Sequence, residues 1–123
     1  RGSWPSETVA ARVDVPLLKQ AVLNLMINSL QAMTEGGELL LRLGGDQQRA
    51  TIEVIDTGPG IPQDLREKVF DPYVSGRQGG SGLGLPTTRR IVRQHDGEVS
   101  IDGEPGQGTR FLITLPRVPA PEG

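Results

Sequence analysis

The sequence predicts an α+β fold, a two-layer sandwich in which a mixed, mostly antiparallel sheet of about five strands is covered on one face by about three helices. Strand-like segments follow one another and would pair locally, while the helical segments are too few to cover both faces of a sheet. The chain has 123 residues, enough for one hydrophobic core and too few for two. A doubly wound parallel sheet is therefore disfavoured.

The first two predicted elements are a strand over residues 8–14 and a helix over residues 17–33. The strand prediction depends on alternation of apolar and polar side chains. In the helix, apolar side chains recur at helical spacing, and Pro16 suits a helix start. Gly36 and Gly37 supply the stop, because glycine readily adopts the backbone that ends helices.

A hairpin and a long irregular stretch follow. Residues 38–43 and 50–56 have strand patterns and are joined by a loop over residues 44–49, which predicts antiparallel pairing. Between residues 58 and 84 the pattern is irregular, apart from a short helix expected over residues 63–69. Long irregular stretches in small domains are usually functional, so we expect the site here.

The last third of the chain predicts one more helix and two more strands. The helix runs from Pro86 to about residue 95, with Gly97 as its C-terminal stop. Residues 97–102 and 109–115 alternate in the manner of strands. These elements complete the sheet.

The ends of the chain are expected to lie outside the folded domain, which we assign to residues 8–116. Residues 1–7 are interpreted as a leader or cloning remnant. Residues 117–123 are too rich in proline to join a sheet and are interpreted as a flexible tail.

Composition excludes several function classes. A net charge of −2 with interspersed acids and bases provides no basic surface for nucleic acid or membrane. The absence of cysteine removes disulfides, thiolate metal sites and thiol nucleophiles, and is compatible with the cytoplasm. No apolar run approaches the roughly 20 residues that span a bilayer. We therefore expect a cytoplasmic domain that contacts neither nucleic acid nor membrane.

The long helix has a polar stripe. Asn24 and Asn28 are four residues apart and share a face, which Gln20 and Gln31 extend. The stripe is either a solvated face or a site, and asparagine is a poor helix former that an exposed face would not favour. An amide oxygen can complete a magnesium shell filled otherwise by phosphate oxygens and water.

Asp56 ends a strand whose inward side also carries Ile52 and Val54, so its carboxylate points into the interior. A buried carboxylate needs a hydrogen-bond donor. Asp56 either caps its own turn or accepts a hydrogen bond from the exocyclic amine of a base. Adenine has an amine at the position where guanine has a carbonyl, so the second reading favours ATP over GTP.

A glycine-rich segment precedes the last helix. Glycines let backbone amides approach an anion, and a helix N-terminus adds partial positive charge, so phosphate is the expected guest. Arg77 could reach a terminal phosphate. The segment lacks the lysine of a P-loop and the spacing of a Rossmann fingerprint. It runs Gly79-Gly80-Ser81-Gly82-Leu83-Gly84-Leu85.

Together these clusters resemble, in order, the motifs of the Bergerat-fold ATP-binding family of histidine kinases, gyrase-type topoisomerases, MutL-type repair proteins and ninety-kilodalton heat-shock chaperones. The resemblance covers nearly the whole chain and is strongest to nitrogen-regulation sensor histidine kinases. The matching segments are Asn24–Ala32 (N box), Asp56–Ile61 (G1), Phe70-Asp71-Pro72-Tyr73 (F box), Gly82–Leu85 (G2) and Gly106–Phe111 (the last glycine motif).

The resemblance implies ATP and Mg²⁺ as cofactors. Asn28 would bind Mg²⁺, Asp56 would bind the adenine amine with support from Thr109, and a lid over residues 69–81 would close on the phosphates. The residues expected to be catalytic are Asn24, Asn28 and Arg77. Those expected to bind the nucleotide are Asn24, Asn28, Gln31, Asp56, Gly58, Gly60, Ile61, Phe70, Tyr73, Arg77, Ser81, Gly82, Leu83, Gly84, Leu85 and Thr109.

The resemblance further implies histidine kinase activity. Relatives that hydrolyse ATP usually have a glutamate at the position of Asn24, and an amide cannot take a proton from water. The phosphoacceptor would be a histidine on an upstream dimerisation domain, not His95, and the phosphoryl group would pass on to a response regulator. The full-length protein would be a homodimer and could be membrane-anchored. Two alternatives stay open: an anti-sigma-type serine kinase and a degenerate ATP-binding module without transfer activity.

Overall fold

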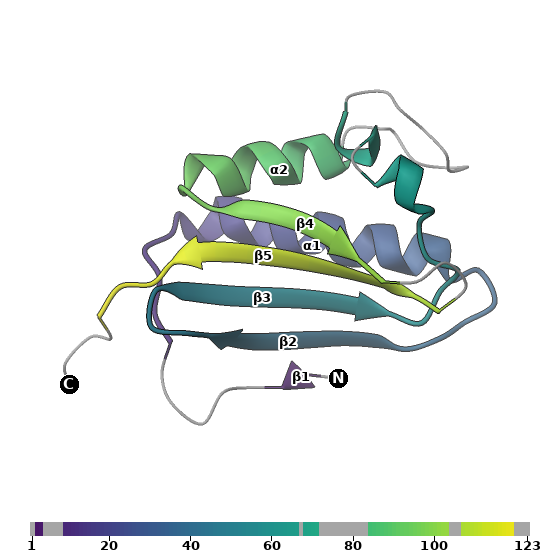
Figure 1. Ribbon diagram of the computed structural model, residues 1–123, viewed down its shortest axis with the longest axis horizontal. Helices are drawn as coiled ribbons and strands as arrows, with labels where there is room; N and C mark the ends of the chain where they lie inside the picture. The colour runs from purple at the N-terminus through teal and green to yellow at the C-terminus, as the bar shows by residue number, and fades with distance from the viewer. Residues whose placement is uncertain (1, 4–8, 67, 72–83, 104–106, 120–123) are drawn as a thin grey trace.

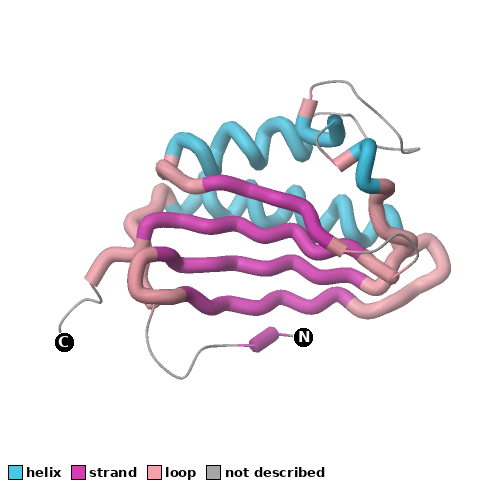
Figure 2. The backbone as a smooth tube through the Cα atoms, viewed as in Figure 1, coloured by secondary structure: helices cyan, strands magenta, loops and turns pink. Residues whose placement is uncertain are grey.

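Five strands form one sheet in the computed structural model, which describes residues 2–3, 9–66, 68–71, 84–103 and 107–119. The strand order is β1-β2-β3-β5-β4; β1 pairs with β2 in parallel and the other pairs are antiparallel. The helices lie on one face of the sheet (Figures 1 and 2). The predicted two-layer α+β fold is confirmed. The strands are β1 Gly2–Ser3, β2 Leu39–Gly45, β3 Arg49–Asp56, β4 Glu98–Asp102 and β5 Thr109–Pro116.

Two α-helices provide most of the second layer. Helix α1 spans Val15–Ala32, and the Asp14 carboxylate caps it by accepting a hydrogen bond from the backbone N–H of Leu17 at 3.1 Å. Helix α2 spans Gly84–Gln94 and lies beside α1 and β4 (Figure 1). Among the described residues, no helix has the length and apolar composition that crossing a bilayer requires.

The core lies between the helices and the inward side of the sheet. Alternate residues of β3 and β5 point inward, and Val54, Phe111 and Ile113 are fully buried there. From the helices, Ala21 and Val92 are also fully buried. The aliphatic core predicted from the composition is therefore present, with Phe111 among its largest side chains.

The predicted strand over residues 8–14 is wrong. Of the described part of this segment, residues 9–14, only Ala10 forms a bridge, with Val118. The free edge of β2, where a further strand would pair, is instead occupied by Gly2–Ser3. Residues 2–3 and Val118, which the sequence assigned to a leader and a tail, thus pair with the described domain.

Two helix predictions also need correction. The short helix expected over residues 63–69 is replaced by two 3₁₀ turns, η1 Gln63–Leu65 and η2 Lys68–Phe70. A helix this short is costly to nucleate, and single 3₁₀ turns are the usual connectors. Helix α2 begins at Gly84, before Pro86. The first turn of an α-helix needs no backbone N–H donors, so it accepts a proline anywhere within it.

Candidate functional site

Asp56 lies at the C-terminal end of β3 and is 3% exposed. Its Oδ1 accepts a hydrogen bond from the backbone N–H of Gly58 at 2.9 Å. Within the described residues this is the one hydrogen bond that its carboxylate makes. An ionised carboxylate can accept about four hydrogen bonds, so Asp56 retains capacity for a ligand.

The neighbouring backbone approaches Asp56 closely. Thr109 of β5 is directly opposite Asp56 in the sheet and is also buried. Gly108 has a φ of +109°, and a side chain there would overlap the Asp56 carbonyl. At Gly58 a Cβ would lie 3.1 Å from Asp56 Oδ1. The glycines on both sides of Asp56 therefore leave room for the chain to fold tightly around the carboxylate.

Thr57 connects this strand end to the loop after α1. The Thr57 Oγ1 accepts a hydrogen bond from the Glu38 N–H at 2.9 Å, and the Thr57 N–H donates to the Glu38 carbonyl at 3.2 Å. Met33, at the end of α1, lies against Thr57 and Gly58. Asp56 is thus held next to the C-terminal end of α1. Asn28 lies one helical turn before that end.

The polar stripe of α1 divides into two parts. Asn24 donates from Nδ2 to the Gly84 carbonyl at 3.2 Å and accepts from Gln20 Nε2 at 2.8 Å. Asn28 is half-buried, and its Oδ1 atom is buried, whereas Gln31 is exposed. Asn24 therefore faces α2, and Asn28 turns its Oδ1 away from solvent.

Three predicted nucleotide contacts have buried side chains. Ile61, Phe70 and Leu85 are each 6% exposed or less and belong to the hydrophobic core cluster. The guanidinium of Arg89 lies 5.4 Å from the centre of the Phe70 ring and fixes the 3₁₀ turn η2 against α2. Any contact of Ile61 or Leu85 with a nucleotide must therefore use the backbone.

The structure brings Asp56, Gly58 and Thr109 together at the end of β3, and it joins Asn24 of α1 to Gly84 of α2. Asn28 lies one turn after Asn24 on α1, and Gly60 follows Gly58 in the G1 segment. The predicted site residues Tyr73, Arg77, Ser81, Gly82 and Leu83 lie outside the described residues.

Sequence reasoning did not identify several residues that shape this site. Arg66 donates to the carbonyls of Ile61 and Gly103, and so ties the G1 segment to the turn after β4. Thr88 is fully buried and donates to the carbonyls of Gly84 and Ala21. The spacing of four residues between Gly84 and Thr88 on one helix is the only sequence signal that could have suggested the hydrogen bond from the Thr88 hydroxyl to the Gly84 carbonyl.

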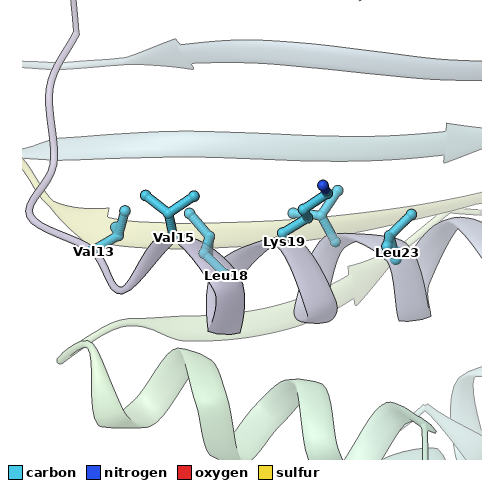
Figure 3. A pocket seen from close by; sticks show the side chains of 6 residues that line it. Val13, Val15, Leu18, Lys19 and Leu23 are labelled. Atoms are coloured by element: carbon cyan, nitrogen blue, oxygen red, sulfur yellow. The ribbon is translucent and has the colours of Figure 1, made fainter.

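An apolar hollow of about 350 Å³ lies elsewhere, on the side of α1 away from α2 (Figure 3). Its lining has one charged side chain, that of Lys19. Leu23, which also lines it, and Ile27 and Leu30 further along α1 are exposed apolar residues of the same helix. Apart from Lys19 the lining is apolar, and it shares no residue with the candidate site.

With the site geometry established, comparison with known proteins is decisive. Residues 13–119 match the family described as histidine kinase-, DNA gyrase B- and HSP90-like ATPases. The chain belongs to this family. Within it the chain is a catalytic ATP-binding domain of the sensor histidine kinase type, as its relatives and its structural neighbours agree.

The curated relatives are sensor kinases. The chain is 43% identical over 114 residues to the sensory histidine kinase/phosphatase NtrB of Escherichia coli O157:H7, covering 84% of this chain and 32% of NtrB. It is 41% identical over 99 residues to sporulation kinase D of Bacillus subtilis, covering 80% of this chain and 20% of that kinase. The chain thus spans between a fifth and a third of these relatives.

Solved structures agree on the fold. The mycobacterial sensor histidine kinase MprB has a TM-score of 0.83 at 31% identity, over 97% of this chain and 83% of that one. Full-length ShkA, solved in complex with AMPPNP, has a TM-score of 0.85 at 33% identity, over 97% of this chain and 26% of that one. The likeness therefore extends through the candidate site.

Proposed function

We propose that this domain binds ATP with Mg²⁺ and donates the γ-phosphoryl group to a histidine on a separate dimerisation domain, for onward transfer to a response regulator. The observation that supports the proposal most is the buried Asp56 carboxylate, which accepts one hydrogen bond from Gly58 and has capacity left. An adenine amine would donate to it, whereas guanine has a carbonyl at that position. Thr109, from β5, would support the carboxylate.

Phosphate binding is assigned to the N-terminal end of α2. Backbone N–H groups of the first helical turn lack intrahelical acceptors and carry partial positive charge. Gly84 starts this turn, and among the described residues no atom lies within 4 Å of the position that a Cβ would take there. The lid residues Tyr73, Arg77, Ser81, Gly82 and Leu83 are proposed to complete the phosphate contacts.

The metal assignment fits the donor set. Among the described residues, no three histidine, cysteine, aspartate or glutamate side chains are placed to hold a metal ion. Mg²⁺ often keeps phosphate and water ligands and needs only one or two protein oxygens. Asn28 would supply one such oxygen, and the ion would neutralise phosphate charge there.

The transfer step needs no protein base that activates water. A nitrogen of the acceptor imidazole forms a bond to the γ-phosphorus while the bond from phosphorus to the β–γ bridging oxygen breaks, and ADP leaves with that oxygen. Asn24, an amide, cannot accept a proton from water, which favours transfer over hydrolysis. Positioning and charge neutralisation are then the domain's main contributions.

Calorimetric titration with ATP and GTP, each with and without Mg²⁺, tests the proposal. We expect selective, metal-assisted ATP binding. In the Asn28→Ala variant, ATP should still bind, but Mg²⁺ should no longer raise the affinity. Equal binding of ATP and GTP would reject the adenine assignment, and an unaltered metal response would reject Asn28 as the ligand.

Transfer is tested by adding a histidine-bearing helical domain from a sensor kinase and [γ-³²P]ATP. Label should appear on that domain and be stable to base but not to acid, as phosphohistidine is. Label on a serine of a partner protein would instead support the serine-kinase alternative. ATP binding without label on any supplied acceptor would support a non-transferring module.

A further inference from the structure

A chain of hydrogen bonds runs from Gln20 on α1 to the first residue of α2. Gln20 Nε2 donates to Asn24 Oδ1 at 2.8 Å, and Asn24 Nδ2 donates to the Gly84 carbonyl at 3.2 Å. An amide oxygen can only accept and an amide nitrogen can only donate. The Gly84 carbonyl can only accept, so Asn24 Nδ2 faces α2, and the hydrogen bond from Gln20 holds the opposite end of the same amide, Asn24 Oδ1, in place.

The Gly84 carbonyl has a second side-chain donor. Thr88 Oγ1 lies 3.0 Å from the Gly84 carbonyl and 3.2 Å from that of Ala21. A hydroxyl has one hydrogen, so Thr88 must share it between the two carbonyls. Thr88 and Ala21 are fully buried, which shows that α1 and α2 approach closely here. Asn24 is the donor from α1 that ties the Gly84 carbonyl directly to the other helix.

We propose that Gln20, which belongs to none of the nucleotide-binding motifs, is a positioning residue for nucleotide binding. It restrains the Asn24 side chain so that Asn24 anchors the N-terminal end of α2 through Gly84. The favourable field of a helix end falls off within its first turn, so a small displacement of this end weakens phosphate binding. The inference rests on the proposed function.

Single substitutions give the first test, by calorimetric titration with Mg²⁺-ATP. Gln20→Ala should lower the ATP affinity about threefold, and Asn24→Ala about tenfold, because one and then both bonds of the chain are lost. Alanine is a better helix former than glutamine, so α1 stays folded in the first variant. Gln94→Ala, an exposed glutamine at the far end of α2, is the matched control and should leave the affinity unchanged.

A double-mutant cycle decides whether Gln20 acts through Asn24. In the Asn24→Ala background, Gln20→Ala should cause no further loss of ATP affinity. Gln20→Glu should cost more than Gln20→Ala in the wild-type background, because a carboxylate draws Asn24 Nδ2 away from Gly84. Equal losses from Gln20→Ala in both backgrounds, or no loss in either, would overturn the positioning role.

Amide hydrogen exchange without nucleotide provides an independent readout. The backbone N–H of Thr88 donates to the Gly84 carbonyl in an α-helix, so its exchange reports on the first turn of α2. Exchange should become several times faster in Gln20→Ala and unchanged in Gln94→Ala. Unchanged exchange in Gln20→Ala would overturn the inference, whereas failure of the wild type to bind ATP would reject the proposed function alone.

Discussion

Two buried carboxylates lie three residues apart on β3 and point to opposite faces of the sheet. Glu53, 8% exposed, is on the face that α1 and α2 do not cover, and Asp56, 3% exposed, is on the helix side. Glu53 receives hydrogen bonds from Arg42 at 2.9 and 2.7 Å and from Arg110 at 2.6 Å. Asp56, within the described residues, receives one from the Gly58 backbone.

The difference separates a structural carboxylate from one available to a ligand. The two guanidinium groups on Glu53 balance its charge inside the fold, and Arg110 also pairs with Asp102 at 3.2 Å, so the network spans β2, β3, β5 and β4. Asp56 has no guanidinium within salt-bridge distance among the described residues. Under the proposed function the Asp56 carboxylate is kept for a ligand, whereas Glu53 is paired within the fold.

The largest expected effect is that of Asp56→Asn on ATP binding. The variant replaces an acceptor-only oxygen with an NH₂ group that opposes the adenine amine, so affinity should fall at least about 100-fold. The free energy of unfolding should change by less than about 0.5 kcal/mol, because no ion pair is lost. Calorimetry and urea denaturation measure the two quantities. Unchanged ATP affinity in Asp56→Asn would reject the assignment of Asp56 as the ligand-binding carboxylate.

Glu53→Gln should lower the stability of the fold and leave ATP binding nearly unchanged, the opposite of Asp56→Asn. It leaves Arg42 and Arg110 without their shared carboxylate, so the free energy of unfolding should fall by about 2 kcal/mol. ATP affinity should stay within twofold of the wild type, since the side chain is on the far face of the sheet. Urea denaturation followed by circular dichroism checks the first quantity. A large loss of ATP affinity at full stability would contradict the structural assignment of Glu53.

In acid, the difference in the free energy of unfolding between the wild type and Glu53→Gln should disappear. Hydrogen bonds from Arg42, together with those from Arg110, hold the pKa of Glu53 below its usual value of 4.5, although burial opposes them. A folded-state pKa below the unfolded one adds stability that is complete above pH 4.5 and lost as pH falls through the folded value. Most of the about 2 kcal/mol gap in the free energy of unfolding should therefore disappear as the pH falls from 4.5 through the folded-state pKa of Glu53.

The gap between the two proteins is the quantity to measure, not the acid sensitivity of either. Backbone N–H groups of Gln48 and Arg49 lower the pKa of Asp46 as well, so both proteins lose some stability in acid. A gap that stays constant down to pH 3 would show that the ion pairs of Glu53 contribute nothing to stability.

The contrast also shows what the sequence could predict. Alternation along β3 correctly placed Asp56 inward, because that inference needs only a local period of two. The partners of Glu53 come from β2 and β5, and their placement depends on a strand register that local pattern does not specify. The strand expected over residues 8–14 failed for a similar reason: local alternation does not specify which segment pairs with β2, and residues 2–3 make that contact.

The site divides in the same way. The order of the motifs that contain Asn24, Asn28 and Asp56 was sufficient to predict the family, which the match over residues 13–119 confirms. The roles of these three residues stay a prediction. The bond from Asn24 to Gly84 links residues 60 apart and could not be predicted, because it depends on how α1 packs against α2. Packing, and not propensity, determines which atom of a polar side chain is used.

Ser29 is a third kind of buried polar group, and its substitution should have the smallest effect. It is 1% exposed, and the described part of the chain offers its Oγ no hydrogen-bond partner. Ser29→Ala should raise the free energy of unfolding by about 1 kcal/mol beyond the roughly 0.5 kcal/mol that helix propensity supplies. A gain no larger than the propensity part, measured by urea denaturation, would mean that a bound water satisfies the hydroxyl. Ser29 would then resemble Glu53, whose polar atoms are paired within the fold, instead of being a buried group that costs stability.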